Sequence, residues 1–123
     1  MPTVAILGAS SNRTKFGNKA VRAFRDCGWT VLPVNPRETA VEGLPCLSGS
    51  DAIPPGVDVV SAYLPPGVLW IELETLARKG CAELWLNPGT DTADVLEKCR
   101  QLGLVVVQVC SIVRLGRHPQ DYP

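Results

Sequence analysis

Residues 4–17 read V-A-I-L-G-A-S-S-N-R-T-K-F-G, which is an apolar run, a turn of small and polar residues, and the start of an amphipathic segment. This order is typical of a buried strand that feeds a helix N-terminus, where backbone N–H groups and the helix dipole attract an anion. We therefore interpret the turn as a nucleotide phosphate loop, with an ordinary strand-to-helix turn as the alternative. The residues expected to form the loop are Gly8, Ala9, Ser10, Arg13, Lys15 and Gly17.

The rest of the chain alternates between helical and strand periodicity. Apolar residues at helical spacing, followed each time by a glycine, predict helices over residues 16–27, 68–79 and 93–102. Continuous apolar runs predict strands over residues 4–7, 30–34, 57–64, 82–86 and 104–109. We expect a loop over 38–50 and a single turn over 51–53. Strands without polar alternation indicate a parallel sheet covered by helices on both faces.

Five such strands fit an α/β fold with a Rossmann-like, doubly wound parallel sheet, and we predict the strand order 3-2-1-4-5. Ligands of such sheets bind at the carboxyl ends of the strands, beside the first strand. The loops expected at that edge are residues 8–17, 35–37, 64–67 and 87–90. A flavodoxin-like order would keep the same loops at the same edge. Pro33 fits the second strand only if its missing N–H lies at the strand end or faces away from the ladder.

Length and composition narrow the class of protein. With 123 residues the chain suits one domain, predicted over residues 1–116 and followed by a polar tail over 117–123. Twelve basic and twelve acidic residues balance, so no overall field draws the protein to nucleic acid or to an anionic membrane. The five cysteines form no C-x-x-C pair and lie mostly in apolar segments, as reduced cysteines do. We therefore expect a cytoplasmic protein that contacts neither nucleic acid nor membrane.

The second loop, Asn35-Pro36-Arg37, helps to discriminate among nucleotides. Rossmann units that prefer NAD usually carry an acidic residue at the end of the second strand, where it binds both ribose hydroxyls. No carboxylate occurs here before Glu38, and Arg37 instead suits an additional phosphate. The first turn also departs from G-x-G-x-x-G, because Ser10 stands at the second glycine position and Gly17 lies too far along for the third. These features disfavour NAD and leave NADP as an alternative.

Five segments at the predicted loop positions carry a resemblance to a known family. They are V-A-I-L-G-A-S (4–10), T-V-L-P-V-N-P (30–36), G-L-P-C (43–46), V-D-V-V-S-A-Y-L-P-P (57–66) and W-L-N-P-G-T (85–90). Together they resemble the small, stand-alone bacterial CoA-binding domain proteins, which are similar to the CoA-binding domain of succinyl-CoA synthetase alpha chains and of ADP-forming acyl-CoA synthetases. The resemblance spans residues 4 to about 116. It implies a Rossmann-like fold that binds coenzyme A or an acyl-CoA, and it does not by itself imply catalysis.

The resemblance also assigns parts of the ligand to parts of the chain. Gly8, Ser10 and the region of Arg13 and Lys15 would bind the CoA phosphates, and Asn35-Pro36-Arg37 would bind the adenosine part. The physical interpretation of the first loop agrees with this assignment, because both place an anion at the same helix N-terminus.

Two further loops are assigned in the same way. Leu64-Pro65-Pro66 would form a wall beside the adenine or the pantetheine arm, because prolines cost little entropy to order around a ligand. A plain helix start is the alternative for these prolines. Asn87 begins the fourth loop at the same edge. Many relatives carry a basic, cysteine-containing segment after the last strand, whereas this chain has V-C-S-I-V-R (109–114), so the role of that segment stays open.

Candidate catalytic residues are few. The only histidine, His118, lies in the polar tail, which we expect to be loose. No metal-ligand spacing and no cluster of carboxylates occurs. Cys110 is the candidate nucleophile because it follows the fifth strand at the ligand edge, and core packing is its alternative role. If CoA binds there, exchange with CoA disulfide would attach one CoA to Cys110.

The residues thus leave three functions open. The leading prediction is a CoA-binding or acyl-CoA-binding protein without catalytic activity. A subunit of an NADP-binding reductase is the second, and it would need another domain or subunit to contact the substrate. An interaction scaffold with a vestigial nucleotide pocket is the third.

Overall fold

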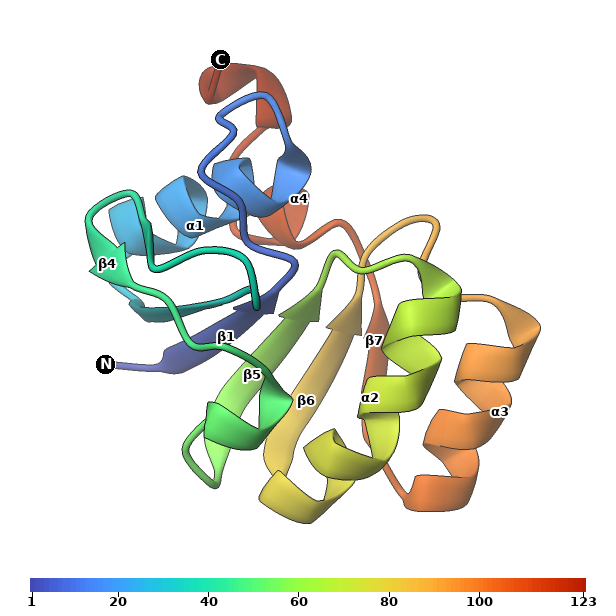
Figure 1. Ribbon diagram of the computed structural model, residues 1–123. Helices are drawn as coiled ribbons and strands as arrows, with labels where there is room; N and C mark the ends of the chain where they lie inside the picture. Colours follow the sequence, from blue (N-terminus) through green and yellow to red (C-terminus); the bar gives the residue numbers. More distant parts are fainter.

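A parallel sheet with helices on both faces forms the centre of the computed structural model, which describes residues 1–123 (Figure 1). The sheet contains β1 (Thr3–Leu7), β2 (Thr30–Val34), β5 (Val57–Ala62), β6 (Cys81–Leu86) and β7 (Val106–Gln108). The helices are α1 (Phe16–Asp26), α2 (Pro66–Lys79), α3 (Ala93–Leu102) and the short α4 (Ser111–Arg114). A hairpin joins β3 (Ala40–Val41) to β4 (Leu44–Pro45), and 3-10 turns cover Ser50–Ala52 and Pro119–Asp121. The predicted Rossmann-like α/β fold is confirmed.

The order of the strands is β2-β1-β5-β6-β7, so the predicted order 3-2-1-4-5 is wrong; the five predicted strands stand in the order 2-1-3-4-5. The third of them, β5, pairs with β1 instead of extending the sheet beyond β2. The outer edge of β2 is a poor partner for another strand, because Pro33 lacks an N–H on that side. Leu47 covers this edge, since its N–H donates to the Pro33 carbonyl at 2.8 Å and its carbonyl accepts from Asn35 N at 2.9 Å.

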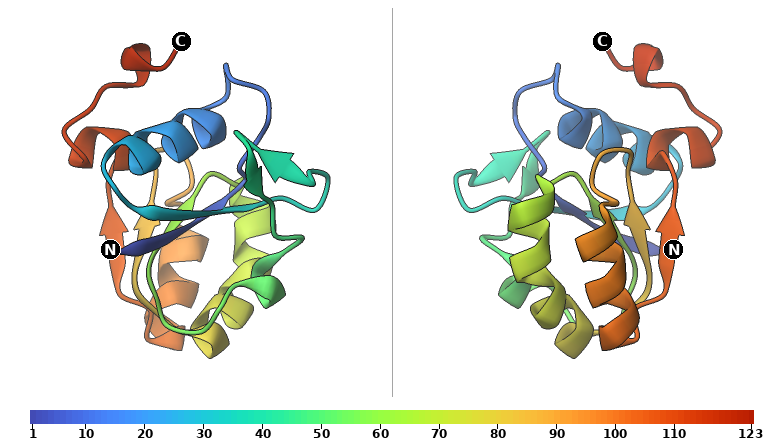
Figure 2. Two further views of the ribbon diagram at one scale, coloured as in Figure 1. Left: turned by 90° about the vertical axis from the view of Figure 1, so that its left-hand side faces the viewer. Right: turned by 90° about the vertical axis from the view of Figure 1, so that its right-hand side faces the viewer.

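The two faces of the sheet pack against different helices (Figure 2). Val4 and Ile6 belong to the apolar cluster that contains Phe24 of α1 and Ile112 of α4. Ala5 and Leu7 belong to the opposite cluster, which contains the buried residues of α2 and α3. These four residues of β1 are at most 1% exposed, which explains why the strand is an unbroken apolar run.

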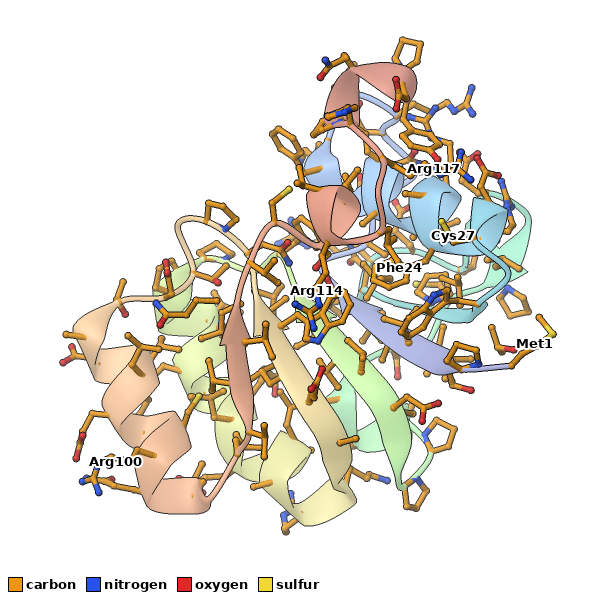
Figure 3. All side chains as sticks on the ribbon, turned by 180° about the vertical axis from the view of Figure 1, so that it is seen from behind. Met1, Phe24, Cys27, Arg100, Arg114 and Arg117 are labelled. Atoms are coloured by element: carbon orange, nitrogen blue, oxygen red, sulfur yellow. The ribbon has the colours of Figure 1, made fainter.

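The C-terminal segment packs on α1 rather than extending into solvent. Tyr122 is 6% exposed, and the buried guanidinium of Arg22 donates to the Tyr122 carbonyl at 3.1 Å. Arg117 lies beside Cys27 at the end of α1 (Figure 3). The expectation that residues 117–123 are loose is therefore wrong, because a buried cation and an aromatic side chain hold the segment on the helix.

Two other segments differ from the expectation. The predicted strand over residues 104–109 is regular only in β7, although Leu84 N donates to the Val105 carbonyl at 2.8 Å and Val109 N donates to the Leu86 carbonyl at 3.0 Å. The predicted loop over 38–50 contains the β3–β4 hairpin. None of the helices has both the length and the apolar composition needed to span a bilayer.

Candidate functional site

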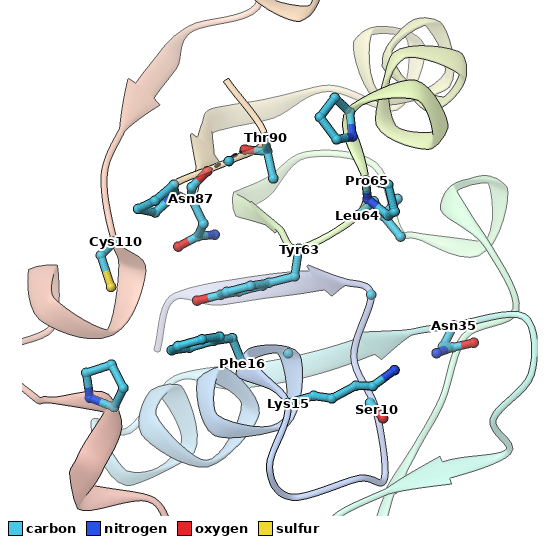
Figure 4. A pocket seen from close by; sticks show the side chains of 16 residues that line it. Ser10, Lys15, Phe16, Asn35, Tyr63, Leu64, Pro65, Asn87, Thr90 and Cys110 are labelled. Atoms are coloured by element: carbon cyan, nitrogen blue, oxygen red, sulfur yellow. Dashed lines mark hydrogen bonds between the residues drawn. The ribbon is translucent and has the colours of Figure 1, made fainter. Parts of the chain in front are cut away.

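A cavity of about 830 Å³ lies at the carboxyl edge of the sheet (Figure 4). Pockets that bury small ligands and cofactors usually measure about 300–1,000 Å³. The wall of the cavity comes from the first loop and the start of α1, from the loops after β2, β5 and β6, and from the segments that flank α4. The lining residues are Gly8, Ser10, Lys15, Phe16, Gly17, Asn35, Tyr63, Leu64, Pro65, Pro66, Asn87, Pro88, Gly89, Thr90, Cys110 and Pro119.

The N-terminus of α1 opens into this cavity without a cap. Lys15 is the N-cap residue, no side chain accepts a hydrogen bond from the first turn, and the first turn contains no acidic residue. The backbone N–H groups of Phe16 and Gly17 therefore have no acceptor within the chain. Lys15 is the only charged residue of the lining, and its ammonium group forms no ion pair. The first loop thus offers two N–H donors, the positive end of a helix dipole and a free cation to an anion.

Two glycines allow this close arrangement of loop and helix. A Cβ on Gly17 would lie 2.2 Å from the Gly8 carbonyl oxygen. Gly8 itself has φ +83°, and a Cβ there would lie 2.8 Å from the Tyr63 carbonyl oxygen. The interpretation that Gly17 lies too far along to replace the third glycine of G-x-G-x-x-G is therefore wrong, because the longer loop folds back and Gly17 gives the close packing of helix on strand. Substitution of Gly8 would also strain the fold and would not test ligand binding alone.

A buried polar network fixes the shape of the first loop. Asn18 is fully buried, and its amide donates to the Ser10 carbonyl at 2.8 Å and to Glu42 Oε2 at 3.1 Å. Arg22 donates to Asn18 Oδ1 at 2.8 Å and to the Arg13 carbonyl at 3.0 Å, and its burial lowers the pKa of the guanidinium. The hydrogen bond from Asn18 holds the pKa of Glu42 below its ordinary value. Glu42 in turn pairs with Arg13 at 3.3 Å. Arg13 therefore supports the loop from outside and does not line the cavity.

The second loop is tied to the first. Asn35 lines the cavity, and its amide donates to the Ala9 carbonyl at 2.7 Å while its Oδ1 accepts from Arg37 N at 2.8 Å. Glu38 reaches the first loop as well, because its Oε2 accepts from Ser11 N at 2.8 Å. A carboxylate therefore does stand beside the first loop, and the argument against NAD from a missing carboxylate is weaker than the sequence indicated.

Asn87 connects three elements behind the cavity wall. Its amide nitrogen donates to the Ala62 carbonyl at 2.8 Å and to Ser61 Oγ at 3.1 Å, and its Oδ1 accepts from Ser111 N at 2.8 Å. Its carbonyl accepts from Thr90 Oγ1 at 2.7 Å. These internal partners satisfy the side chain, so Asn87 shapes the wall and offers little polar capacity to a ligand.

Tyr63 and Cys110 lie on the side of the cavity away from Asn35, and Tyr63 and Phe16 both point toward Cys110 (Figure 4). The Tyr63 hydroxyl is buried without a hydrogen-bond partner. Burial raises its pKa above the ordinary value, and interactions with the hydroxyls of Ser61 and Ser111 oppose part of that rise. The phenol is therefore protonated at neutral pH. Cys110 lines the cavity, as exchange with CoA disulfide would require. The exchange itself stays a prediction.

The structure brings nine of the thirteen predicted site residues to the cavity wall. The nine are Gly8, Ser10, Lys15, Gly17, Asn35, Leu64, Pro65, Pro66 and Asn87. Ala9 is fully buried, Arg13 pairs with Glu42, and Pro36 and Arg37 are exposed outside the lining. The predicted site residues left out Phe16, Pro88, Gly89 and Thr90, although these lie within the loops 8–17 and 87–90 that we placed at the ligand edge. Sequence reasoning missed Tyr63, which directly borders the loop 64–67, and Pro119.

The chain is similar in sequence to part of a larger protein. The chain is 33% identical over 76 residues to the ADP-forming acetate–CoA ligase I of Archaeoglobus fulgidus, a match that covers 62% of this chain and 11% of that protein. The chain thus spans about a tenth of the length of this relative.

Solved structures are similar over nearly the whole chain. A conserved hypothetical protein from Pyrococcus furiosus has a TM-score of 0.87 and 30% identity, with 93% of this chain and 99% of that chain covered. A hypothetical protein from Pyrococcus horikoshii has a TM-score of 0.82 and 26% identity, with 91% and 79% covered. The sequence model of the CoA binding domain matches residues 2–116, which include the whole sheet and the whole cavity wall except Pro119. This chain belongs to the CoA binding domain family.

Proposed function

We propose that the chain binds coenzyme A or an acyl-CoA in the cavity, with the phosphates at the N-terminus of α1. The observation that carries the proposal is the uncapped first turn of α1, with free N–H groups on Phe16 and Gly17 beside the unpaired ammonium of Lys15. A phosphate group would satisfy all three donors. Membership of the CoA binding domain family supports CoA as the compound that brings this phosphate.

The rest of the cavity fits the other parts of CoA. Leu64, Pro65 and Pro66 give a stiff apolar wall next to the first loop, on which an adenine or the pantetheine arm can pack. The exposed Arg37 is the last residue of the second loop and suits the additional phosphate of the CoA ribose, although it stands outside the lining.

We also propose that the chain catalyses no reaction by itself. The cavity lining contains no histidine and no carboxylate, so it offers neither of the usual general bases. Cys110 has no neighbouring base in the lining that would activate it. The A. fulgidus relative is a ligase, but the present chain matches only 11% of that protein. Five free cysteines are consistent with a reducing compartment, and we infer a cytoplasmic location.

Calorimetric titration with CoA, NADP, NAD and ATP in parallel tests the proposal. We expect CoA to bind, and NAD to bind more weakly or not at all. The substitutions Lys15→Ala and Arg37→Ala should each reduce the free energy of CoA binding by about 1–3 kcal/mol. Lys79→Ala is the matched control, because it removes a lysine at the far end of α2. NADP bound more tightly than CoA would favour the reductase-subunit alternative, and no binding of any nucleotide would favour the interaction scaffold.

A further inference from the structure

The two ends of the cavity differ in charge. At the end formed by the first loop, Lys15 supplies the only charge of the lining and α1 supplies its positive dipole end. At the end formed by the loops after β6 and β7, the lining consists of Asn87, Pro88, Gly89, Thr90 and Cys110, and none of these side chains carries a formal charge when the thiol is protonated. A ligand that fills the cavity therefore meets cationic groups at one end and uncharged groups at the other.

The uncharged end also has few polar groups to offer, and the side-chain hydroxyl without an internal partner there is that of Tyr63, which points toward Cys110. The Asn87 amide is fully used by internal partners, and Thr90 Oγ1 donates to the Asn87 carbonyl at 2.7 Å. Thr90 N donates to the same carbonyl at 3.0 Å, which closes a tight turn over Pro88 and Gly89. The uncharged end of the lining contains no cation that could pair with a carboxylate.

The residue that follows this part of the lining in the sequence carries a carboxylate. Asp91 follows the turn directly, and its carboxylate accepts a hydrogen bond from Gln108 Nε2 at 3.0 Å. This bond, together with backbone N–H groups that include that of Gly89, holds the pKa of Asp91 below its ordinary value. Asp91 is therefore ionised at neutral pH, next to a residue that lines the cavity.

The pantetheine arm of a bound CoA is long enough to connect the two ends. Adjacent strands lie ~4.8 Å apart, so the three spacings from β1 to β7 amount to ~14 Å. An extended arm with the backbone length of four to five residues spans ~15 Å. With the phosphates at α1, the thiol or thioester would reach the uncharged end.

We propose that this end of the cavity receives the acyl group of an acyl-CoA and selects uncharged acyl groups over those that end in a carboxylate. The inference rests on the proposed function and adds the class of acyl group to it. An acyl carboxylate would lose water without gaining a cation and would lie close to the like charge of Asp91, whereas an acetyl group needs no polar partner.

Titration of the full chain with CoA, acetyl-CoA, succinyl-CoA and adenosine 3′,5′-bisphosphate tests the inference. We expect acetyl-CoA to bind about as tightly as CoA, and succinyl-CoA to bind about tenfold more weakly or worse. Equal affinity for acetyl-CoA and succinyl-CoA would overturn the selectivity while leaving CoA binding intact. Failure of both CoA and adenosine 3′,5′-bisphosphate to bind would instead overturn the proposed function.

Two variants locate the selectivity. Pro88→Lys adds a cation to an exposed position of the uncharged end and is expected to raise succinyl-CoA affinity severalfold, whereas the matched control Pro88→Gln is not. Asp91→Asn keeps an oxygen that can accept from Gln108, and it is expected to reduce the difference in affinity between acetyl-CoA and succinyl-CoA. The control Asp94→Asn lies outside the lining and should leave this difference in affinity unchanged. If none of these variants changes the difference in affinity between acetyl-CoA and succinyl-CoA, the acyl group binds elsewhere and the inference is overturned.

Discussion

The N-termini of α1 and α3 lie at the same edge of the sheet but differ in how their first turns are capped. In α3 the Thr92 side chain accepts from Val95 N at 3.4 Å, and Asp94 places a negative charge in the first turn. In α1 the N-cap is Lys15, no side chain caps the helix, and no acid is present in the first turn. The first turn of α3 therefore has a cap within the chain, whereas the first turn of α1, like that of α2, has neither a side-chain cap nor an acidic residue.

The N-terminus of α2 makes the comparison sharper. Gly67 and Gly17 both stand at the second position of a helix, in α2 and α1. A Cβ on Gly67 would meet nothing within 4 Å, whereas a Cβ on Gly17 would collide with the Gly8 carbonyl. The glycine of α1 is therefore required by the close approach of the first loop, and the glycine of α2 is not.

The largest effect is expected from Gly17→Ala. The added methyl group must push the first loop away from α1, which should lower the free energy of unfolding by about 3 kcal/mol. Urea denaturation measures this loss. The matched control Gly67→Ala should raise stability by about 0.5 kcal/mol, because alanine is the better helix former at an unobstructed position. Equal effects of the two substitutions would contradict the close packing of α1 on the loop.

Lys15→Asp should close the open N-terminus of α1. An aspartate at the N-cap accepts the free N–H groups, so the unliganded protein should gain about 1 kcal/mol of stability. The same change puts a carboxylate where we propose that the phosphate binds, and CoA affinity should fall about a hundredfold, or ~2.7 kcal/mol. Thermal denaturation without ligand and calorimetry with CoA give the two values. An unchanged CoA affinity would contradict the proposal that the phosphates bind at the N-terminus of α1.

Glu42→Gln tests whether the network around Asn18 holds the first loop. At neutral pH the variant should lose about 1.5 kcal/mol of stability, as expected for a charged hydrogen-bond acceptor. The pKa of Glu42 is lower in the folded than in the unfolded state, so its contribution is complete above the ordinary value of 4.5 and is lost as the pH falls through the folded value. The difference between parent and variant, followed by denaturation at several pH values, should therefore shrink in acid. A difference independent of pH would argue against an ionised Glu42.

Thr92→Ala should have the smallest effect and should separate the two helix N-termini. Loss of the cap should cost about 1 kcal/mol of stability. CoA affinity should not change, because Thr92 lies outside the cavity lining. Paired measurements of stability and affinity check this, and a parallel loss of CoA affinity would mean that α3 contributes to the site after all.

Local patterns in the sequence were sufficient to predict much of this protein. The apolar run before Gly8 and the glycines after the three main helices depend only on neighbouring residues, and the structure confirms the elements that they predict. The first loop and the loops that begin at Leu64 and Asn87 line the cavity at the carboxyl edge of the sheet, as expected, because the carboxyl ends of parallel strands share one edge whatever their order.

Only the tertiary structure decided the strand order, the packing of Gly17 on Gly8, the engagement of Arg13 by Glu42, and the entry of Pro119 into the cavity wall. Each of these depends on contacts between residues far apart in the chain. Pro33 shows the reason most clearly: the sequence reveals that it lacks a donor, but which edge of β2 lacks that donor depends on how β2 pairs with β1 and Leu47. A single sequence specifies which groups are present, and the folded chain determines which of them remain free for a ligand.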